Sequence, residues 1–296
     1  MSDVQIGINP LTWSNDDMRV LGEETPLEVC LAESREAGYS GVELGSKFPR
    51  TAATLGPILQ RFDRQLVSGW YSSNLLERDA GEEIAALAPH LDLLKELGAK
   101  VMVYCEVTGA IHGQSRTPLS RRPRMREEQW QLFLPRLTEV ADYLHSQGVA
   151  MAYHHHMGTV IQSAEDVRRL LAGTGDNVGL LLDTGHLVYA GGNPLVLIRQ
   201  WGKRINHVHC KDLRQAVYLD CLNRDLSFLD AVVNGAFTVP GDGFLDYLQL
   251  TEELKRIGYR GWLVVEADQD PTVAPSLPFA RKGFAHLRHC IDQSGL

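Results

Sequence analysis

The sequence predicts an α/β domain with the (β/α)8 architecture of a TIM barrel. Eight short apolar runs alternate strictly with eight amphipathic stretches, which is the pattern of a parallel sheet closed on itself. The phrases EAGYSGVEL, ELGAKVMVY and RIGYRGWLVVE repeat one theme, a helix end followed by a glycine turn and a buried strand. The chain has 296 residues, and a single barrel commonly takes about 250. An open, doubly wound sheet is the alternative architecture.

The predicted strands are short and rich in β-branched and aromatic residues, as expected where both faces of a parallel sheet are buried. In chain order they are residues 4–9, 41–45, 66–71, 100–106, 149–155, 178–183, 205–210 and 262–267. Each interval between two strands is long enough for a crossover helix, so parallel pairing is expected.

The predicted helices fill these intervals. In chain order they are residues 27–37, 52–62, 82–97, 126–145, 164–171, 194–201, 245–257 and 279–291. Four of them end at Gly38, Gly98, Gly148 and Gly258, where a left-handed residue typically stops a helix.

Two insertions interrupt the alternation, at residues 107–125 and 211–243. Both follow the carboxyl end of a strand, where the active sites of barrels lie, so both are candidate loops over a substrate. No linker or composition shift marks a second domain. We therefore expect one domain over residues 1–296.

The bulk composition disfavours several classes of protein. Lys and Arg number 29 against 37 Asp and Glu, a net charge of −8 that argues against nucleic-acid binding. No apolar run reaches the roughly 18 residues of a membrane span, and the N-terminus lacks the layout of a signal peptide. The five cysteines show no C-x-x-C spacing. Reduced thiols and a cytoplasmic location are expected.

Four of the predicted strands end in a residue that can bind a divalent metal: His154, Asp183, His209 and Glu266. Parallel strands deliver these side chains to the same edge, so four remote residues are expected to converge. Two imidazoles with two carboxylates suit Mn²⁺, Co²⁺, Fe²⁺ or Zn²⁺ better than Ca²⁺ or Mg²⁺. His156 is the alternative to His154, because alternate residues of a strand share a face.

Two motifs, DTGH at 183–186 and HVHCKD at 207–212, resemble the xylose isomerase-like barrels, a superfamily of sugar isomerases, epimerases and endonuclease IV. Within it, an ordered set of phrases over about residues 5–275 resembles the myo-inosose-2 dehydratases of inositol catabolism. These phrases are GVELGSKFPR, EVTGAIHGQSRTPLSRRP, YHHHMGT, LLDTGHLVYAGG, HVHCKD, FTVPGDG and VVEADQDP.

The resemblance implies a hydro-lyase that removes water from 2-keto-myo-inositol to give a trihydroxycyclohexane-1,2-dione. It implies Mn²⁺ or Co²⁺ as the cofactor, with Fe²⁺ and Zn²⁺ as alternatives, acting as a Lewis acid on the ketone. The expected partner is a small polyol ketone, with no nucleic acid or membrane, and the chain is expected to form a homo-oligomer.

The resemblance also suggests catalytic roles. In the related ketose epimerases, two metal-binding glutamates face opposite sides of the substrate; Glu266 matches one, and His154 stands in place of the other. A metal-bound imidazole has no free lone pair, so proton removal from one side followed by elimination is expected. Glu266 or Lys211 is the candidate base, since a nearby metal would lower the lysine pKa. His186 and His156 are the candidate acids.

A polyhydroxylated ring needs many hydrogen bonds and few positive charges. We expect Glu106 and His112, which follow the fourth strand, to contact substrate hydroxyls. Trp13, Glu43, Lys47 and Trp70, at the ends of the first three strands, are candidates for the rest of the wall.

Three other functions fit parts of the pattern. A sugar isomerase or epimerase would share the metal and the first proton transfer. A DNA-repair endonuclease would need more metal ligands and a basic surface. A sugar-binding barrel without turnover would keep the fold alone.

Overall fold

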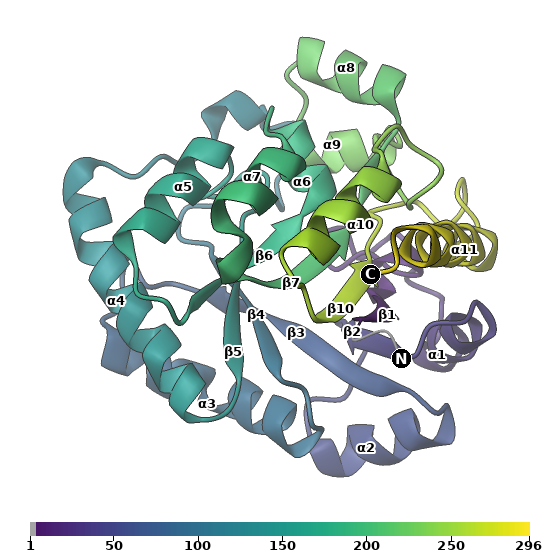
Figure 1. The fold of residues 1–296 in the computed structure, drawn as a ribbon, viewed down its shortest axis with the longest axis horizontal. Helices are drawn as coiled ribbons and strands as arrows, with labels where there is room; N and C mark the ends of the chain where they lie inside the picture. The colour runs from purple at the N-terminus through teal and green to yellow at the C-terminus, as the bar shows by residue number, and fades with distance from the viewer. Residues whose placement is uncertain (1–3) are drawn as a thin grey trace.

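Eight parallel strands close into a barrel in the order β1-β10-β7-β6-β5-β4-β3-β2, as predicted. The computed structural model describes residues 4–296 (Figure 1). The barrel strands are β1 (Val4–Ile8), β2 (Gly41–Leu44), β3 (Gln65–Ser73), β4 (Val101–Glu106), β5 (Ala150–His154), β6 (Val178–Asp183), β7 (Ile205–Cys210) and β10 (Gly261–Val265). Every one overlaps its predicted run, and the neighbouring strands pair in parallel, so the open sheet is excluded.

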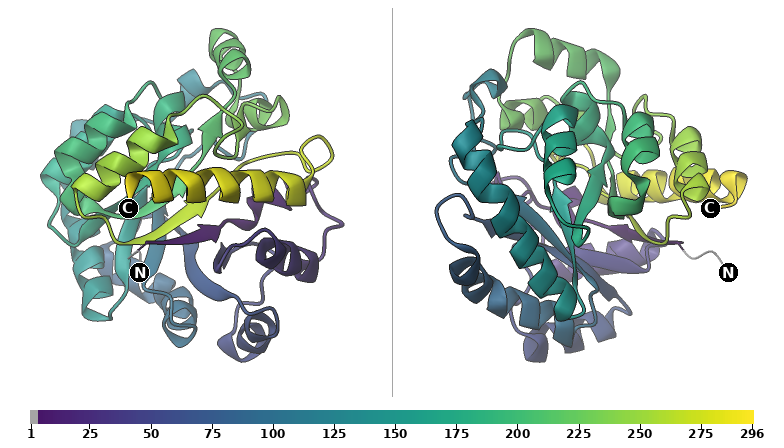
Figure 2. Two further views of the ribbon diagram at one scale, coloured as in Figure 1. Left: turned by 45° about the vertical axis from the view of Figure 1, so that its right-hand side comes forward. Right: turned by 60° about the vertical axis from the view of Figure 1, so that its left-hand side comes forward.

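Helices surround the barrel on its outside (Figures 1 and 2). They are α1 (Leu27–Glu36), α2 (Ala52–Arg61), α3 (Ala80–Glu96), α4 (Glu127–Ser146), α5 (Ala164–Gly173), α6 (Thr184–Tyr189), α7 (Pro194–Trp201), α10 (Tyr247–Arg256) and α11 (Ser276–Ser294). Only the short α6 was not expected. The four glycines predicted to stop helices all have positive φ, between 69° and 107°.

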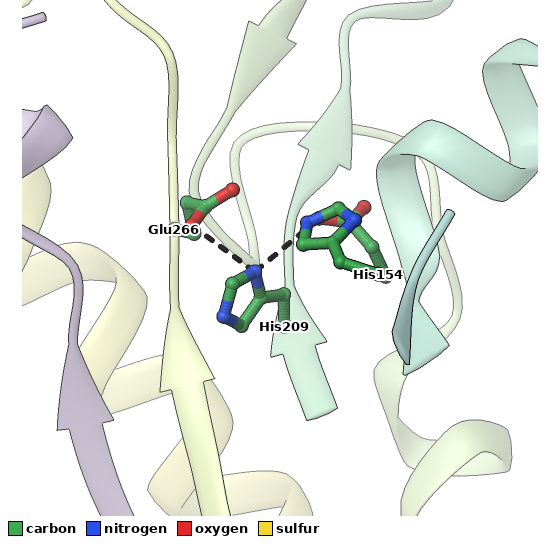
Figure 3. A group of neighbouring side chains, drawn as sticks. His154, His209 and Glu266 are labelled. Carbon is green, nitrogen blue, oxygen red and sulfur yellow. Dashed lines mark ion pairs between the residues drawn. The ribbon is translucent and has the colours of Figure 1, made fainter. Parts of the chain in front are cut away.

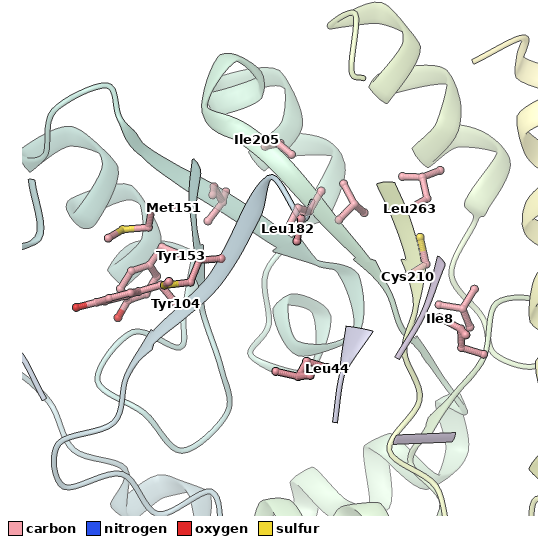
Figure 4. Packing of buried hydrophobic residues seen from close by; sticks show 14 of the residues in the cluster. Ile8, Leu44, Tyr104, Met151, Tyr153, Leu182, Ile205, Cys210 and Leu263 are labelled. Atoms are coloured by element: carbon pink, nitrogen blue, oxygen red, sulfur yellow. The ribbon is translucent and has the colours of Figure 1, made fainter. Parts of the chain in front are cut away.

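The main core lies between the strands and the helices. Alternate residues of the strands, such as Met151 and Tyr153 on β5 and Leu182 on β6, face outward and pack in this cluster (Figure 4). The residues between them face the barrel interior, where Val103 and Ala152 belong to a separate small cluster. This alternation decides which strand-end side chains reach the barrel mouth.

The insertion at 211–243 folds into β8 (Asp212–Leu213), α8 (Gln215–Asn223), α9 (Phe228–Val233) and β9 (Phe237–Thr238). With residues 107–125 it forms a unit that we call the cap. The two segments share an apolar cluster and are joined by hydrogen bonds, including one between backbone groups, Leu119 N to Leu226 O at 3.4 Å, and one from Arg116 N to the side-chain Oδ2 of Asp230 at 2.9 Å. The cap is therefore a packed structure, and its apolar cluster also takes in Met157 and Tyr189 of the barrel.

Two further observations concern the residues that the structure describes. None of the helices within 4–296 is long and apolar enough to cross a membrane. The five cysteines all lie in this range, and each is buried and outside any disulfide.

Candidate metal centre and active-site pocket

Four side chains converge at the carboxyl ends of β5, β6, β7 and β10: His154, Asp183, His209 and Glu266. One nitrogen or oxygen of each lies within 4.8 Å of the corresponding atom of every other member. Figure 3 shows His209 between Glu266 and His154. This is the set that the sequence predicts, and all four side chains are buried.

Asp183 carries the clearest sign that the cluster is built for a cation. Its Oδ1 accepts a hydrogen bond from the backbone N–H of His186 at the start of α6, at 2.7 Å. Its Oδ2 is buried and accepts no hydrogen bond, but lies 3.7 Å from His154 Nε2 and 3.7 Å from His209 Nδ1. A buried carboxylate oxygen without a donor is costly, and a metal ion shared with the two imidazoles would compensate it.

The orientation of His154 also suits a ligand. Its Nδ1–H donates to the carbonyl of His155 at 2.7 Å, which leaves Nε2 facing Asp183. A ligating histidine ordinarily donates its other ring N–H to a neighbouring acceptor in this way. Burial, and after it the charge of His209, lowers the pKa of His154 well below its usual value, so this ring is neutral and can offer a lone pair.

The electrostatic field at the cluster favours positive charge. Burial alone would lower the pKa of His209, but the carboxylates of Glu266 and Glu43 hold it well above its usual value. Burial alone would raise the pKa of Glu266, but His209 and Lys211 lower it to about 2. A field that attracts a proton to His209 attracts a divalent cation for the same reason.

The carboxylates around Lys211 favour its charged form. Its ammonium group is fully buried, 2.7 Å from Glu266 Oε1 and 3.8 Å from Asp183 Oδ2, and it also pairs with Asp268. Burial alone would lower the pKa, but Asp268 and then Glu266 raise it above its usual value. The lowering of this pKa that a nearby metal would cause is a separate effect and stays a prediction; the sequence did not indicate how many carboxylates surround the lysine.

A cavity of about 360 Å³ opens above the cluster, within the usual range for small-molecule pockets. Among the expected residues, His154, His156, His209, Glu266, Trp70 and Glu43 line it. Trp70 lies edge-on to His154 and His156, with ring centroids 5.4 and 5.6 Å apart, and so forms one wall. His112 stands behind His156, its ring centroid 5.3 Å away.

His156 and His186 differ in what they can offer to this pocket. His156 Nδ1–H donates to the carbonyl of Met157 at 2.9 Å, so its Nε2 is free, and burial followed by the charge of His112 lowers its pKa. His186 is engaged on both sides, with Nδ1 3.4 Å from Met157 N and Nε2 2.9 Å from Lys211 Nζ. His186 does not line the cavity.

Three residues expected in the wall are elsewhere. Glu106 is on the outward-facing register of β4, the register of Tyr104, and its carboxylate accepts from the backbone N–H groups of Leu75 and Thr108 at 2.6 and 2.9 Å. Lys47 donates to three carbonyls of residues 22–25. Trp13 is buried and donates to Glu33. The expectation that they face a substrate was wrong.

Several lining residues were not predicted. Asp268 lies two residues beyond Glu266, so strand alternation could have found it. Asn9 ends the first predicted strand and donates to Glu43 at 2.7 Å. Asp16, Asp17 and Arg19 come from the loop after β1, for which the sequence carried no signal.

The cap closes the side of the site next to β6. Phe228 lies 5.0 Å from the ring of His156 and 5.4 Å from that of His186, measured between centroids. Phe237 lies 5.7 Å from His186, and Lys211 Nζ is 5.5 Å from its ring. The cap thus contributes an apolar surface that excludes water from the buried ion pairs.

A closed (β/α)8 barrel with a buried cluster of two imidazoles and two carboxylates at its carboxyl rim has the architecture of a metal-dependent barrel enzyme. Comparison with protein families gives the particular group: the model of the xylose isomerase-like TIM barrel matches residues 31–290. The chain belongs to this family.

Its relatives include a rhizopine catabolism protein and several inosose dehydratases. The chain is 47% identical over 295 residues to the rhizopine catabolism protein MocC of Rhizobium meliloti, covering 100% of this chain and 91% of that protein. It is 42% identical over 287 residues to an inosose dehydratase of Geobacillus thermodenitrificans, covering 96% of each. These alignments span nearly the whole barrel and cap.

Solved structures with low identity share the fold. An L-ribulose 3-epimerase superposes with a TM-score of 0.69 at 16% identity, covering 100% of this chain and 96% of that one. The IOLI protein, solved with a bound zinc atom, gives 0.64 at 19% identity, covering 98% and 97%.

Proposed function

We propose that the protein is an inosose dehydratase, a hydro-lyase that removes water from 2-keto-myo-inositol to give a trihydroxycyclohexane-1,2-dione. The full-length similarity to inosose dehydratases supports the reaction. The observation that carries the chemistry is the buried cluster of His154, Asp183, His209 and Glu266 under a cavity large enough for one such ring.

These four residues would hold a divalent metal, with Mn²⁺ or Co²⁺ as our preferred ions and Fe²⁺ or Zn²⁺ as alternatives. When bound, the metal would polarise the ketone oxygen of the substrate and stabilise the negative charge that develops there. The donor set supports this assignment, because it combines imidazole and carboxylate ligands and contains no thiolate.

Glu266 is our candidate for the base that removes the proton next to the ketone. Its carboxylate lines the cavity and is ionised, with Lys211 on Oε1 and His209 Nδ1 3.0 Å from Oε2. Lys211 keeps its proton, so we assign it the role of a fixed cation that holds Glu266 and Asp268 in place, instead of the role of a base.

His156 is our candidate for the residue at the departing hydroxyl. Its Nε2 is unprotonated and faces the cavity, so in the resting protein it can accept a hydrogen bond from a substrate hydroxyl. The protons balance if the one that Glu266 removes from carbon passes to this atom and from it to the leaving oxygen, so that water departs and Glu266 is ionised again. His186 supports Lys211 from behind and is no longer our candidate acid.

Incubation of the purified protein with Mn²⁺ and 2-keto-myo-inositol tests this proposal. We expect the ultraviolet absorbance of the dione product to appear, and metal content and activity to be lost together in Asp183→Asn and Glu266→Gln. Return of solvent deuterium to the substrate without loss of water would instead identify an epimerase.

A second substrate is favoured by one observation. The chain is 47% identical to the protein named for rhizopine catabolism and 42% identical to the inosose dehydratase of Geobacillus thermodenitrificans. Rhizopine is therefore the second compound to assay, and the ratio of kcat/KM for the two compounds would decide between them.

A further inference from the structure

Glu43 is an unusual residue to find inside the barrel. It lies on β2, where the pairing with β3 shifts register between Val42 and Leu44, and its carboxylate is buried. From there it reaches His207 and His209 on β7, which is separated from β2 in the barrel order by β1 and β10. A buried carboxylate is costly unless its oxygens are fully hydrogen-bonded.

Protein donors surround the carboxylate of Glu43. Oε1 accepts from the hydroxyl of Ser68, from His207 Nε2 at 2.8 Å and from His209 Nε2 at 3.2 Å. Oε2 accepts from Asn9 Nδ2 at 2.7 Å and lies 3.1 Å from His209 Nε2. A carboxylate has about four lone-pair positions, and the protein supplies four donors to this one. Glu43 borders the cavity, but its contacts are with the protein.

The bond to His209 has a consequence for the metal centre. If Nε2 carries the hydrogen donated to Glu43, the neutral ring has its lone pair on Nδ1. That atom lies 3.0 Å from Glu266 Oε2 and 3.7 Å from Asp183 Oδ2, on the side of the proposed metal. Rotation of the ring, or the opposite tautomer, would present a hydrogen there.

We propose that Glu43 is a positioning residue that fixes the tautomer and orientation of His209, so that the metal is bound through Nδ1. This inference rests on the proposed metal centre. A carboxylate behind a ligating histidine both orients the ring and raises its basicity, and its loss typically weakens metal binding by about 10- to 100-fold.

His154 provides an internal contrast. Its own Nδ1–H is held by the backbone carbonyl of His155, so Nε2 is the atom that faces Asp183. The two imidazoles therefore present different nitrogens to one centre. Mutation of a side chain cannot remove the acceptor of His154, whereas it can remove that of His209.

The test uses metal alone, without substrate. Mn²⁺ affinity is measured by competition with a chromophoric chelator for the wild type, Glu43→Ala and Glu43→Gln. We expect about 10- to 100-fold weaker binding for Glu43→Ala and a smaller loss for Glu43→Gln, whose amide oxygen can still accept from His209. Ser68→Ala, which removes another donor to Glu43 without contacting His209, serves as the matched control and should change affinity by no more than about threefold.

A spectroscopic measurement separates positioning from general damage to the fold. In the Zn²⁺-loaded wild type with ¹⁵N-labelled histidine, ring-edited spectra should show His209 metal-bound at Nδ1 and protonated at Nε2. Coordination through Nε2, or wild-type Mn²⁺ affinity in Glu43→Ala, would overturn the proposal. If Glu43→Ala does not fold, the wild-type spectrum and Glu43→Gln decide the question. None of these results depends on dehydratase activity, so failure of the proposed reaction is distinguishable from failure of this inference.

Discussion

Replacement of Lys211 by Met tests the electrostatic account of the site most directly. The substitution keeps the apolar stem and removes the buried ammonium group, which lies against Asp268, Glu266 and Asp183. Breaking a buried ion pair from one side leaves uncompensated charge and typically costs about 3–5 kcal/mol. We expect a loss of this size in metal-free protein.

The thermal shift follows from the size of the chain. At about 2.1 cal/mol/K of unfolding entropy per residue, 296 residues give about 0.6 kcal/mol/K. The expected fall in Tm is therefore about 5–8 °C, measured by circular dichroism in chelator at pH 7.5. Lys95→Met, which removes an exposed lysine bonded to Gln147, is the control and should shift Tm by less than about 1 °C.

A double-mutant cycle with Asp268→Asn shows whether the cost comes from the buried charges. Lys211→Met together with Asp268→Asn should be less destabilised than the sum of the single variants, by about 1–3 kcal/mol. The Lys211→Met variant should also bind Mn²⁺ more tightly, because a positive charge beside the cation is gone, while activity falls. An unchanged Tm, or additive effects in the cycle, would refute the reasoning.

Three further predictions concern the surroundings of the site. Burial raises the pKa of Asp212 from 3.8 to about 6, although the backbone N–H groups that it accepts from act in the opposite direction. The protonated carboxyl is therefore favoured in the folded protein. Its contribution to stability is full below pH 3.8 and is lost as the pH rises through 6. Asp212→Asn should therefore gain about 1.5 kcal/mol relative to the wild type between pH 5 and pH 8, measured by urea unfolding; a constant difference would contradict this. Lys47→Met removes all three hydrogen bonds to the carbonyls of residues 22–25, and since a hydrogen bond to a charged group contributes about 1.5–3 kcal/mol, the free energy of unfolding should fall by at least about 1.5 kcal/mol; an unchanged midpoint in urea unfolding counts against it. Phe228→Ala removes the buried ring of the cap and should cost about 3–5 kcal/mol, unless the cap unfolds independently of the barrel, in which case thermal unfolding would show two transitions.

Strand periodicity explains what the sequence could reveal about the site. His154, Asp183, His209 and Glu266 were predictable because each ends an apolar run and parallel strands share an edge. The same rule would have excluded Glu106 if the inward-facing residues of β4 had been identified. Glu106 is three residues from the inward-facing Val103 and therefore lies on the opposite face of the strand. It would also have included Asp268, two residues beyond Glu266.

Strand periodicity could not predict contacts across the barrel or contacts made by loops. The bond between Glu43 and His209 joins strands that are neither neighbours in sequence nor paired, and depends on a local register shift in β2. The position of Lys47 depends on where the loop after β1 exposes its carbonyls, which no periodic pattern encodes. Burial and neighbouring charges together set the pKa values of the site, and both depend on the whole fold.

The distribution of acid and base groups in the cavity argues for elimination over epimerisation. On the side of β7 and β10, Glu266 is an ionised carboxylate with Lys211 and Asp268 beside it. On the side of β5, Nε2 of His154 faces the metal position, and its Nδ1–H is hydrogen-bonded to the carbonyl of His155. His154 therefore cannot exchange a proton with substrate.

Epimerisation requires a second group that returns the proton to the opposite face of the same carbon. His156, the free imidazole on the β5 side, is instead backed by Phe228 and can address a hydroxyl on a neighbouring carbon. If His156→Gln retained full dehydration while gaining proton exchange at the carbon next to the ketone, the assignment of Glu266 to the proton and His156 to the leaving hydroxyl would be wrong.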